Sequence, residues 1–182
     1  VRFFIDDDII HVNGRPNPES DFNDINTELM LSDISTLESL LTRITKSKLN
    51  DKQKSLLKDQ TTEALSLLNN GAFLDKNNLE KVLEHFPDIK LLTQKPMFII
   101  ANINEDTPQN EIDTFKKLLP KNMKLVQVDV KVESDLNDLS DEDKKEFMKE
   151  FGIKESALSK IIKTGYSLLD LKTFFTSGEK ES

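Results

Sequence analysis

The stretch Lys95-Pro-Met-Phe-Ile-Ile-Ala-Asn-Ile-Asn-Glu105 decides the fold class of this chain. Its apolar run from Met97 to Ala101 follows a proline and is rich in aromatic and β-branched residues, which favours a strand buried on both faces. Such strands are typical of parallel α/β sheets, and ligands bind these sheets in the crevice at the carboxyl ends of the strands. Asn102 and Glu105 are expected to lie at that end.

Asn102 and Glu105 allow two interpretations. The carboxamide of Asn102 offers donors and an acceptor that suit the edge of a purine, and Glu105 adds a carboxylate acceptor three residues later. An ordinary turn, in which both residues cap a following helix, explains the same residues more simply, because short motifs often occur by chance.

The segments after this strand strengthen the α/β interpretation. A helix is expected from about Gln109 to Leu119, and a second strand from Leu125 to Val130. The order strand, helix, strand predicts a right-handed parallel crossover. The loop Asp129-Val130-Lys131 then lies at the same sheet edge as Asn102, and two neighbouring strand ends form a better pocket than one.

The first half of the chain changes from strand to helix patterning. Residues Val1 to Val12 favour strand structure, and Asn13-Gly14 predicts a turn. A helix is expected from about Asp24 and a second from Asp51 to Asn69, joined by a short polar link as an antiparallel hairpin. The expected seam of the first helix comprises Met30, Ile34, Leu37, Leu41 and Ile44, and the second helix presents Leu57, Ala64 and Leu68 on one side.

Three further helices are expected. A short one ends before Pro87, one follows the capping residue Ser140, and the last spans about Glu155 to Leu169. Gly71 and Gly152 suit the positions where helices stop. The last helix is expected to place Leu158, Ile161, Ile162, Leu168 and Leu169 inward.

Basic side chains gather where the hairpin turns. Residues 43–58 of the sequence contain six basic residues and a single acidic one, Asp51. This leaves a local excess of five positive charges (six minus one) in a chain of net charge -8. Phosphates could bind such a patch with salt-dependent affinity, and a solvated hairpin tip explains the pattern equally well. The six basic residues are Arg43, Lys46, Lys48, Lys52, Lys54 and Lys58.

Composition sets the outer bounds. The 182 residues suffice for one domain or slightly more, and 36% hydrophobic content supports a core. The mean hydropathy of -0.48 and 32% charged residues indicate much helical surface. The absence of cysteine excludes disulfides and thiolate metal sites. We expect a cytoplasmic protein, since no apolar run could span a bilayer and no signal peptide is apparent.

No catalytic or metal-binding constellation is evident. His11 and His85 have no partner motif, so a surface or packing role is expected for both. Asp6, Asp7 and Asp8 alternate in direction on an extended chain, which favours a solvated loop over a site for a hard metal ion. The chain begins in a predicted strand and ends in another, Lys172 to Gly178, so we expect an internal piece of a longer protein.

Five segments follow one another in a recognisable order: Arg2 to Val12, Asp24 to Asp33, Lys95 to Asp106, Ser156 to Tyr166 and Leu171 to Gly178. Taken together, they resemble the YchF or Obg-like ATPase family. The resemblance extends over essentially the whole chain and is weakest from Lys46 to Leu92. A set of ordered matches is far more specific than Asn102 and Glu105 alone, so a binding pocket becomes the favoured interpretation.

The resemblance implies a domain plan. Family members are P-loop NTPases of the translation-factor type, with a helical coiled-coil insertion and a small TGS domain. The expected fold class is therefore α/β: the C-terminal part of a G domain with a mostly parallel sheet, an inserted helical hairpin, and the start of a β-rich TGS domain. Residues 1–22 and 91–170 correspond to the G domain, 23–90 to the insertion, and 171–182 to the TGS domain.

The resemblance also implies base recognition. Asn102 stands in the fourth nucleotide motif, Ile103 lines the base, and Glu105 replaces the Asp of true GTPases. That Asp accepts two hydrogen bonds from guanine, whereas a longer Glu can swing away from the unprotonated ring nitrogen of adenine. Asp129 and Val130 complete the expected base contacts, although the family usually has small residues there.

Neither a Gly-x-x-x-x-Gly-Lys-Ser/Thr motif nor an Asp-x-x-Gly motif is present. Phosphates and Mg²⁺ would therefore be held by residues outside this chain, and this piece alone should not hydrolyse nucleotide. We expect a monomeric, ribosome-associated parent that binds and hydrolyses ATP, with GTP less favoured. The alternative is a non-catalytic helical module that binds RNA or ribosomes through the basic hairpin tip.

Overall fold

The computed structural model describes residues 1–174 except 7, 76, 122 and 154. Of the terminal strand expected from Lys172 to Gly178, residues 172–174 have no regular secondary structure and residues 175–178 lie outside the described residues. The chain divides into two compact units, Val1–Glu19 with Pro96–Ser182, and Ser20–Lys95. Within the described ranges, no helix is long and apolar enough to cross a membrane.

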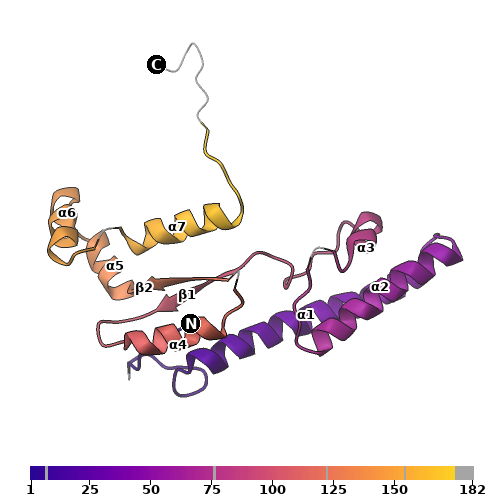
Figure 1. Cartoon of the computed structure of the whole chain (residues 1–182), viewed down its shortest axis with the longest axis horizontal. Helices are drawn as coiled ribbons and strands as arrows, with labels where there is room; N and C mark the ends of the chain where they lie inside the picture. Colours follow the sequence, from indigo (N-terminus) through magenta and orange to yellow (C-terminus); the bar gives the residue numbers. More distant parts are fainter. Residues whose placement is uncertain (7, 76, 122, 154, 175–182) are drawn as a thin grey trace, which may run out of the picture. The chain divides into compact units, whose positions relative to one another are not determined.

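The unit Ser20–Lys95 is helical. It contains most of α1 (Pro18–Lys46), then α2 (Asp51–Asn69) and the short α3 (Glu80–His85). Figure 1 shows α2 running back alongside α1. Both long helices and the segment around α3 contribute to one buried cluster: Leu37, Leu40, Ile44, Leu57, Ala64, Leu68, Leu74, Leu79, Val82, Ile89 and Leu91.

Helix α1 begins earlier than the sequence pattern indicated. It starts at Pro18 rather than near Asp24, because proline is favoured in the first turn of a helix, where its missing N–H is not needed. Its buried seam also differs by one residue, since Leu40 is fully buried and Leu41 is only half-buried. The buried polar residue Asp33 joins that seam.

Helix α2 has the expected bounds. Asn50 is its N-cap in a capping box: the Asn50 side chain accepts from the backbone of Gln53, and the Gln53 side chain accepts from the backbone of Asn50. Gly71 follows the helix with φ of +77°, the left-handed conformation expected at that position. These two signals fix both ends of the helix locally.

The other unit contains a small parallel sheet. Strands β1 (Phe98–Asn102) and β2 (Lys124–Val128) pair in register from Phe98 with Lys124 to Asn102 with Val128, which confirms parallel pairing. On the other edge of β1, Arg2 forms an isolated parallel bridge with Asn102. The two strands are connected by α4 (Gln109–Leu118).

Three more helices follow β2, namely α5 (Val130–Asn137), α6 (Asp141–Glu150) and α7 (Ala157–Leu168). Helix α7 covers one face of the sheet, where Ala157 and Ile161 pack against Val126 and Val128. In Figure 1, α4 lies on the opposite side of the strands from α7. The ring of Phe115 on α4 meets that of Phe3 edge to face, with centroids 5.3 Å apart.

Two expectations about burial are wrong. Strand β1 is not buried on both faces, since Ile100 is 36% exposed. Helix α7 packs more on β2 than on β1. In α7 itself, Ala157 and Ile161 take the sheet-facing positions four residues apart, so the expected inward residues Leu158, Ile162 and Leu169 are exposed.

Two segments also differ in type. Val130, expected to end a strand, is the first residue of α5, and β2 already ends at Val128. Residues 9–12 do not continue a strand, and Ile10 and Val12 are almost fully exposed. The chain turns at Asp6 instead, where the Asp6 carboxylate accepts from the backbone of Asp8 and the Asp6 carbonyl accepts from Ile9.

Candidate functional site

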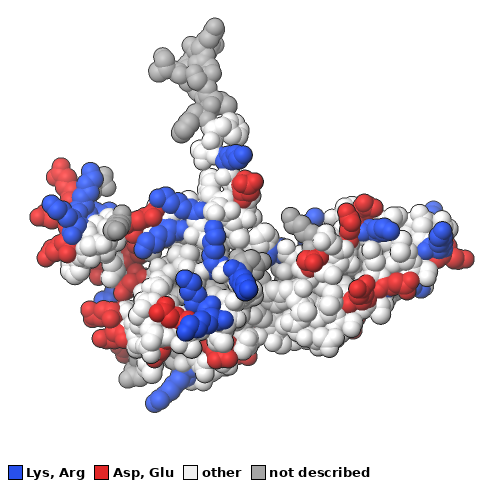
Figure 2. Space-filling model, in the orientation of Figure 1, with Lys and Arg blue, Asp and Glu red and all other residues white. Residues whose placement is uncertain are grey.

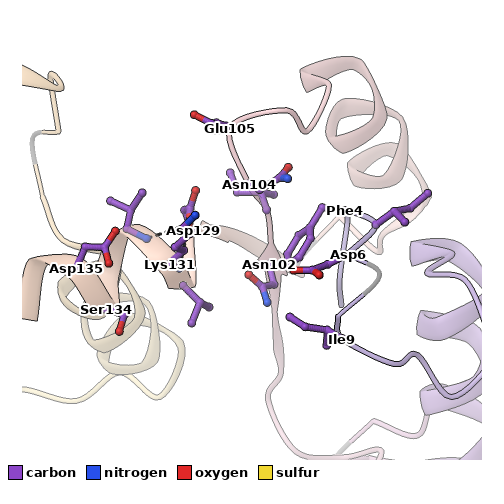
Figure 3. A pocket seen from close by; sticks show the side chains of 14 residues that line it. Phe4, Asp6, Ile9, Asn102, Asn104, Glu105, Asp129, Lys131, Ser134 and Asp135 are labelled. Carbon is purple, nitrogen blue, oxygen red and sulfur yellow. Dashed lines mark hydrogen bonds between the residues drawn. The ribbon is translucent and has the colours of Figure 1, made fainter.

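A cavity of about 670 Å³ opens at the carboxyl ends of β1 and β2. It is lined by all five residues expected to contact a base: Asn102, Ile103, Glu105, Asp129 and Val130. Figure 3 shows this cavity between the end of β1, the start of α5 and the N-terminal segment. Two strand ends therefore combine into one pocket. Lys131, from the loop expected at this edge, also lines the cavity. Further lining residues, which the sequence pattern did not indicate, are Phe4, Ile5, Asp6, Ile9, Asn104, Val132, Ser134 and Asp135.

Asn102 is held firmly at the end of β1. Its backbone N–H donates to the carbonyl of Val1 (2.8 Å), and its carbonyl accepts from the N–H of Phe3 (2.9 Å). The next residue, Ile103, donates to the carbonyl of Val128 on β2 (2.9 Å). Hydrogen bonds on both sides thus fix the backbone position from which the Asn102 side chain extends.

The side-chain oxygen of Asn102 is the clearest sign of an unmet contact in this cavity. Oδ1 is buried, and within the described part of the chain it has no hydrogen-bond partner. A buried, unpaired carboxamide oxygen is unfavourable by roughly 1–3 kcal/mol, so such groups are normally satisfied. Binding of a ligand in the cavity could satisfy it, either by direct contact with this side chain or by bringing a neighbouring donor to Oδ1.

A closed turn carries Glu105. The hydroxyl of Thr107 accepts from the N–H of Asn104 (3.0 Å) and donates to the Asn104 side chain (2.7 Å), and the backbone N–H of Thr107 donates to the Asn104 carbonyl (3.1 Å). Glu105 lies within this turn with an exposed side chain. The turn fixes the backbone of Glu105 and leaves its carboxylate free to rotate.

Asp129 has a structural role that the sequence pattern did not indicate. It is the N-cap of α5, and its carboxylate accepts from the N–H groups of Lys131 (3.0 Å) and Val132 (3.1 Å). This carboxylate is therefore engaged at the helix N-terminus, where the helix dipole also favours it. Val130 is 53% exposed beside the cavity.

The charges lining the cavity favour a neutral part of a ligand. Four carboxylates line it, from Asp6, Glu105, Asp129 and Asp135, whereas Lys131 supplies the one cation among the described lining residues. Phosphate groups would be repelled by such a wall, whereas a neutral heterocycle with hydrogen-bonding edges would not. The residues present thus fit a nucleotide base better than its phosphates.

The expected basic residues lie around the link between α1 and α2, residues 47–50. Lys46, Lys48 and Lys52 are exposed, and Lys54 and Lys58 are partly buried. Figure 2 shows basic side chains at this end of the helix pair, with acidic side chains beside them. The structure therefore makes the first three lysines the most accessible members of the set.

Arg43 differs from these lysines because it is already paired. Its guanidinium donates to both carboxylate oxygens of Asp88 at 2.8 and 3.1 Å, and its Cζ atom lies 5.2 Å from the centre of the Phe86 ring. This hydrogen bond raises the pKa of Arg43 and lowers the pKa of Asp88. Arg43 is the basic residue of the set least available to another anion.

The two histidines do not join a site. His11 is partly buried beside the turn to Gly14, and the ring of His85 contacts the carbonyl of Lys81 within α3. Within the described ranges, no group of three or more His, Cys, Asp or Glu side chains could hold a metal ion.

Comparisons with known proteins identify relatives of this chain. Proteins named ribosome-binding ATPase YchF match the whole chain: that of Haemophilus influenzae is 37% identical over 186 residues, that of Escherichia coli O157:H7 39% over 188, and that of Bacillus subtilis 37% over 193. The chain belongs to the YchF family. This YchF-family chain spans about half the length of those relatives, 51–52%. No protein-family model matches it.

A solved structure gives the same result. The structure of the Schizosaccharomyces pombe YchF GTPase superposes with a TM-score of 0.77 and 26% sequence identity. The match covers 98% of this YchF-family chain and 51% of the yeast protein. The likeness in fold therefore includes both the helical unit and the unit that carries the cavity.

Proposed function

We propose that the cavity at the ends of β1 and β2 binds the base of a nucleotide, and that the full-length protein binds and hydrolyses ATP in preference to GTP. The observation that carries this proposal is the buried, unpartnered Oδ1 of Asn102 in a 670 Å³ cavity that the other expected base contacts also line. The names of the relatives, which call them ATPases and a GTPase, support the same class of ligand.

Each base contact has a defined part in this proposal. Asn102 provides the directional hydrogen bonds, Ile103 packs on the ring, and the exposed carboxylate of Glu105 tolerates adenine because it can turn away from the ring. Val130 adds apolar contact from the start of α5. The Asp129 carboxylate already caps α5, so its contribution is to hold that helix N-terminus in place.

The phosphates and Mg²⁺ belong to a part of the protein beyond this sequence. We propose that residues 1–22 and 91–170 are parts of a P-loop NTPase domain, 23–90 its antiparallel coiled-coil insertion, and 171–182 the start of a TGS domain. Bound Mg²⁺ would neutralise phosphate charge during phosphoryl transfer. The acidic lining of the cavity agrees with a site that takes the base and leaves the phosphates outside.

The proposal is tested by titrating a fluorescent ATP analogue into the full-length protein. Replacing Asn102 with alanine should weaken binding about tenfold, because a directional hydrogen bond is lost. The matched control is Asn110→Ala, which replaces an exposed asparagine on α4 and should bind the analogue as the unsubstituted protein does. Unchanged affinity in Asn102→Ala would contradict the assignment of the pocket.

A second candidate function rests on the exposed lysines between α1 and α2. We propose that Lys46, Lys48 and Lys52 contact phosphates of ribosomal or other RNA, in addition to nucleotide binding or in place of it. Ribosome binding is part of the name of the bacterial relatives. The protein would then be a monomeric, cytoplasmic, ribosome-associated factor.

A further inference from the structure

Arg2 lies beside Asn102 and was not among the expected site residues. The two residues form the parallel bridge at the edge of β1, and the backbone bonds on either side of Arg2 hold Asn102. Paired residues of parallel strands project their side chains to the same side of a sheet, because successive side chains alternate along each strand. The guanidinium and the carboxamide therefore start from neighbouring positions on one face.

The Arg2 side chain also organises one wall of the cavity. Its Nη1 atom donates to the carbonyl of Ile9 at 3.0 Å, and its Cζ atom lies 5.6 Å from the centre of the Phe4 ring. Phe4 and Ile9 both line the cavity, and Figure 3 places Phe4 next to Asn102. One side chain thus holds both ends of the segment opposite α5.

A second nitrogen of that guanidinium, Nε, has no partner within the described residues. Nε of Arg2 is buried and unbonded within the described residues, as is Oδ1 of Asn102. Nε–H is a donor and Oδ1 is an acceptor, so the two orphaned groups are complementary. They start from paired residues, yet no hydrogen bond joins them in this structure.

We infer that Arg2 is the positioning residue of the base site. When a nucleotide enters, the Nε–H of Arg2 donates to Oδ1 of Asn102 and fixes the carboxamide so that its Nδ2 group faces the base. This inference rests on the proposed function. Nδ2 carries donors only, so it pairs with N7, the acceptor that adenine and guanine share. Asn102 then recognises a purine, and the choice between purines is left to Glu105.

Two substitutions separate the positioning role from the wall contact. In Arg2→Lys a methylene replaces Nε, while the terminal ammonium keeps the charge and can still donate to the carbonyl of Ile9. In Arg2→Gln the amide nitrogen stands where Nε was, while the rest of the guanidinium is lost. Arg15→Lys, at an exposed loop position, is the control.

The measurement is the ratio of the Kd values for 7-deaza-ATP and ATP, obtained by displacing a fluorescent ATP analogue from the full-length protein. 7-Deaza-ATP lacks the N7 acceptor. The unsubstituted protein and Arg15→Lys should bind ATP about tenfold more tightly than 7-deaza-ATP. This difference in Kd corresponds to the free energy of roughly one hydrogen bond. Arg2→Lys should lose this preference, as Asn102→Ala should, and Arg2→Gln should retain it. Circular dichroism melting establishes that each variant is folded.

The outcomes separate the two claims. The proposed function is overturned if the unsubstituted protein binds no nucleotide, or if Asn102→Ala binds nucleotide as the unsubstituted protein does. A normal preference in Arg2→Lys, with the preference lost in Asn102→Ala, overturns the role of Arg2 alone. Equal loss of the preference in Arg2→Lys and Arg2→Gln reduces Arg2 to a support for the cavity wall, which also overturns its positioning role.

Discussion

At the scale of a single residue, the length of one side chain at position 105 is expected to set the choice of base. Guanine offers a ring N–H and an exocyclic amine to a carboxylate, whereas adenine offers an unprotonated nitrogen that leaves the carboxylate unpaired. Glu105 is exposed and its turn is closed by Asn104 and Thr107, so its carboxylate can move away while its backbone cannot. A shorter Asp would keep the carboxylate closer to the cavity.

Glu105→Asp should therefore shift the protein toward GTP. The ratio of the Kd values for GTP and ATP should fall about tenfold, because a carboxylate that accepts from guanine discriminates by hydrogen bonding rather than by shape. Competition binding in the full-length protein gives both constants. The neighbouring exposed acid supplies the control, Asp106→Glu, in which the ratio should not change. A ratio that stays constant in Glu105→Asp would assign purine discrimination to another residue.

At the scale of helices and strands, the sequence signals that correctly indicated where an element begins and ends were local. Asn50 and Gly71 define the ends of α2, and both signals are visible in the sequence because capping depends on neighbouring residues. Helix α5 was missed although Asp129 is an N-cap with Glu133 in the first turn, because the alternation of apolar and polar residues in β2 continues to Val130 and suggested a longer strand. Glu133 also accepts from the N–H of Ala157, a contact between elements that no local pattern indicates.

Asp33 is the strongest element-scale contact that the sequence could not reveal. It is 1% exposed on α1, and its carboxylate accepts from the N–H groups of Leu92 and Thr93 and from the Thr93 hydroxyl, each at 2.8 Å. These partners lie about 60 residues away in the segment that leads to β1. A helical seam of Leu and Ile predicts an apolar residue at this position, so only the folded structure explains the acid.

Replacing Asp33 with alanine should lower the free energy of unfolding by about 3 kcal/mol, since it leaves buried donors unpaired. Asp33→Asn keeps one acceptor oxygen and should be intermediate. Urea unfolding followed by circular dichroism measures the midpoint for each variant. Glu38→Ala, at an exposed acid on the same helix, should change the midpoint very little. An Asp33→Ala midpoint equal to that of Glu38→Ala would mean that this carboxylate does not hold the segment.

At the scale of the whole molecule, the α/β character and the position of the cavity were predictable, because parallel strands place their carboxyl ends at one edge. Which faces would be covered was not predictable. Ile100, Leu158 and Ile162 look like core residues in sequence yet are exposed, since the rotation of α7 on the sheet depends on which of its apolar residues meet Val126 and Val128. Likewise, the net charge of the chain gives little information about function, whereas the position of its basic residues gives more.

The basic residues between α1 and α2 give the prediction at this scale. In a chain of net charge -8, long-range attraction to RNA must come from a local patch, and Lys46, Lys48 and Lys52 are its exposed members. Each lysine that neutralises a phosphate releases counterions, which makes log Kobs fall with log salt by about 0.7 to 0.9 per contact. Changing these three lysines to glutamate should abolish association with ribosomes at moderate salt and reduce the slope by about two. Cosedimentation with ribosomes over a range of salt concentrations measures both quantities.

The matched control reverses three exposed lysines around the end of α4, Lys116, Lys117 and Lys121, and therefore makes the same change in net charge. Equal weakening in both triple variants would show that only total charge matters, and association that persists at low salt in the first variant would exclude this patch as the phosphate contact.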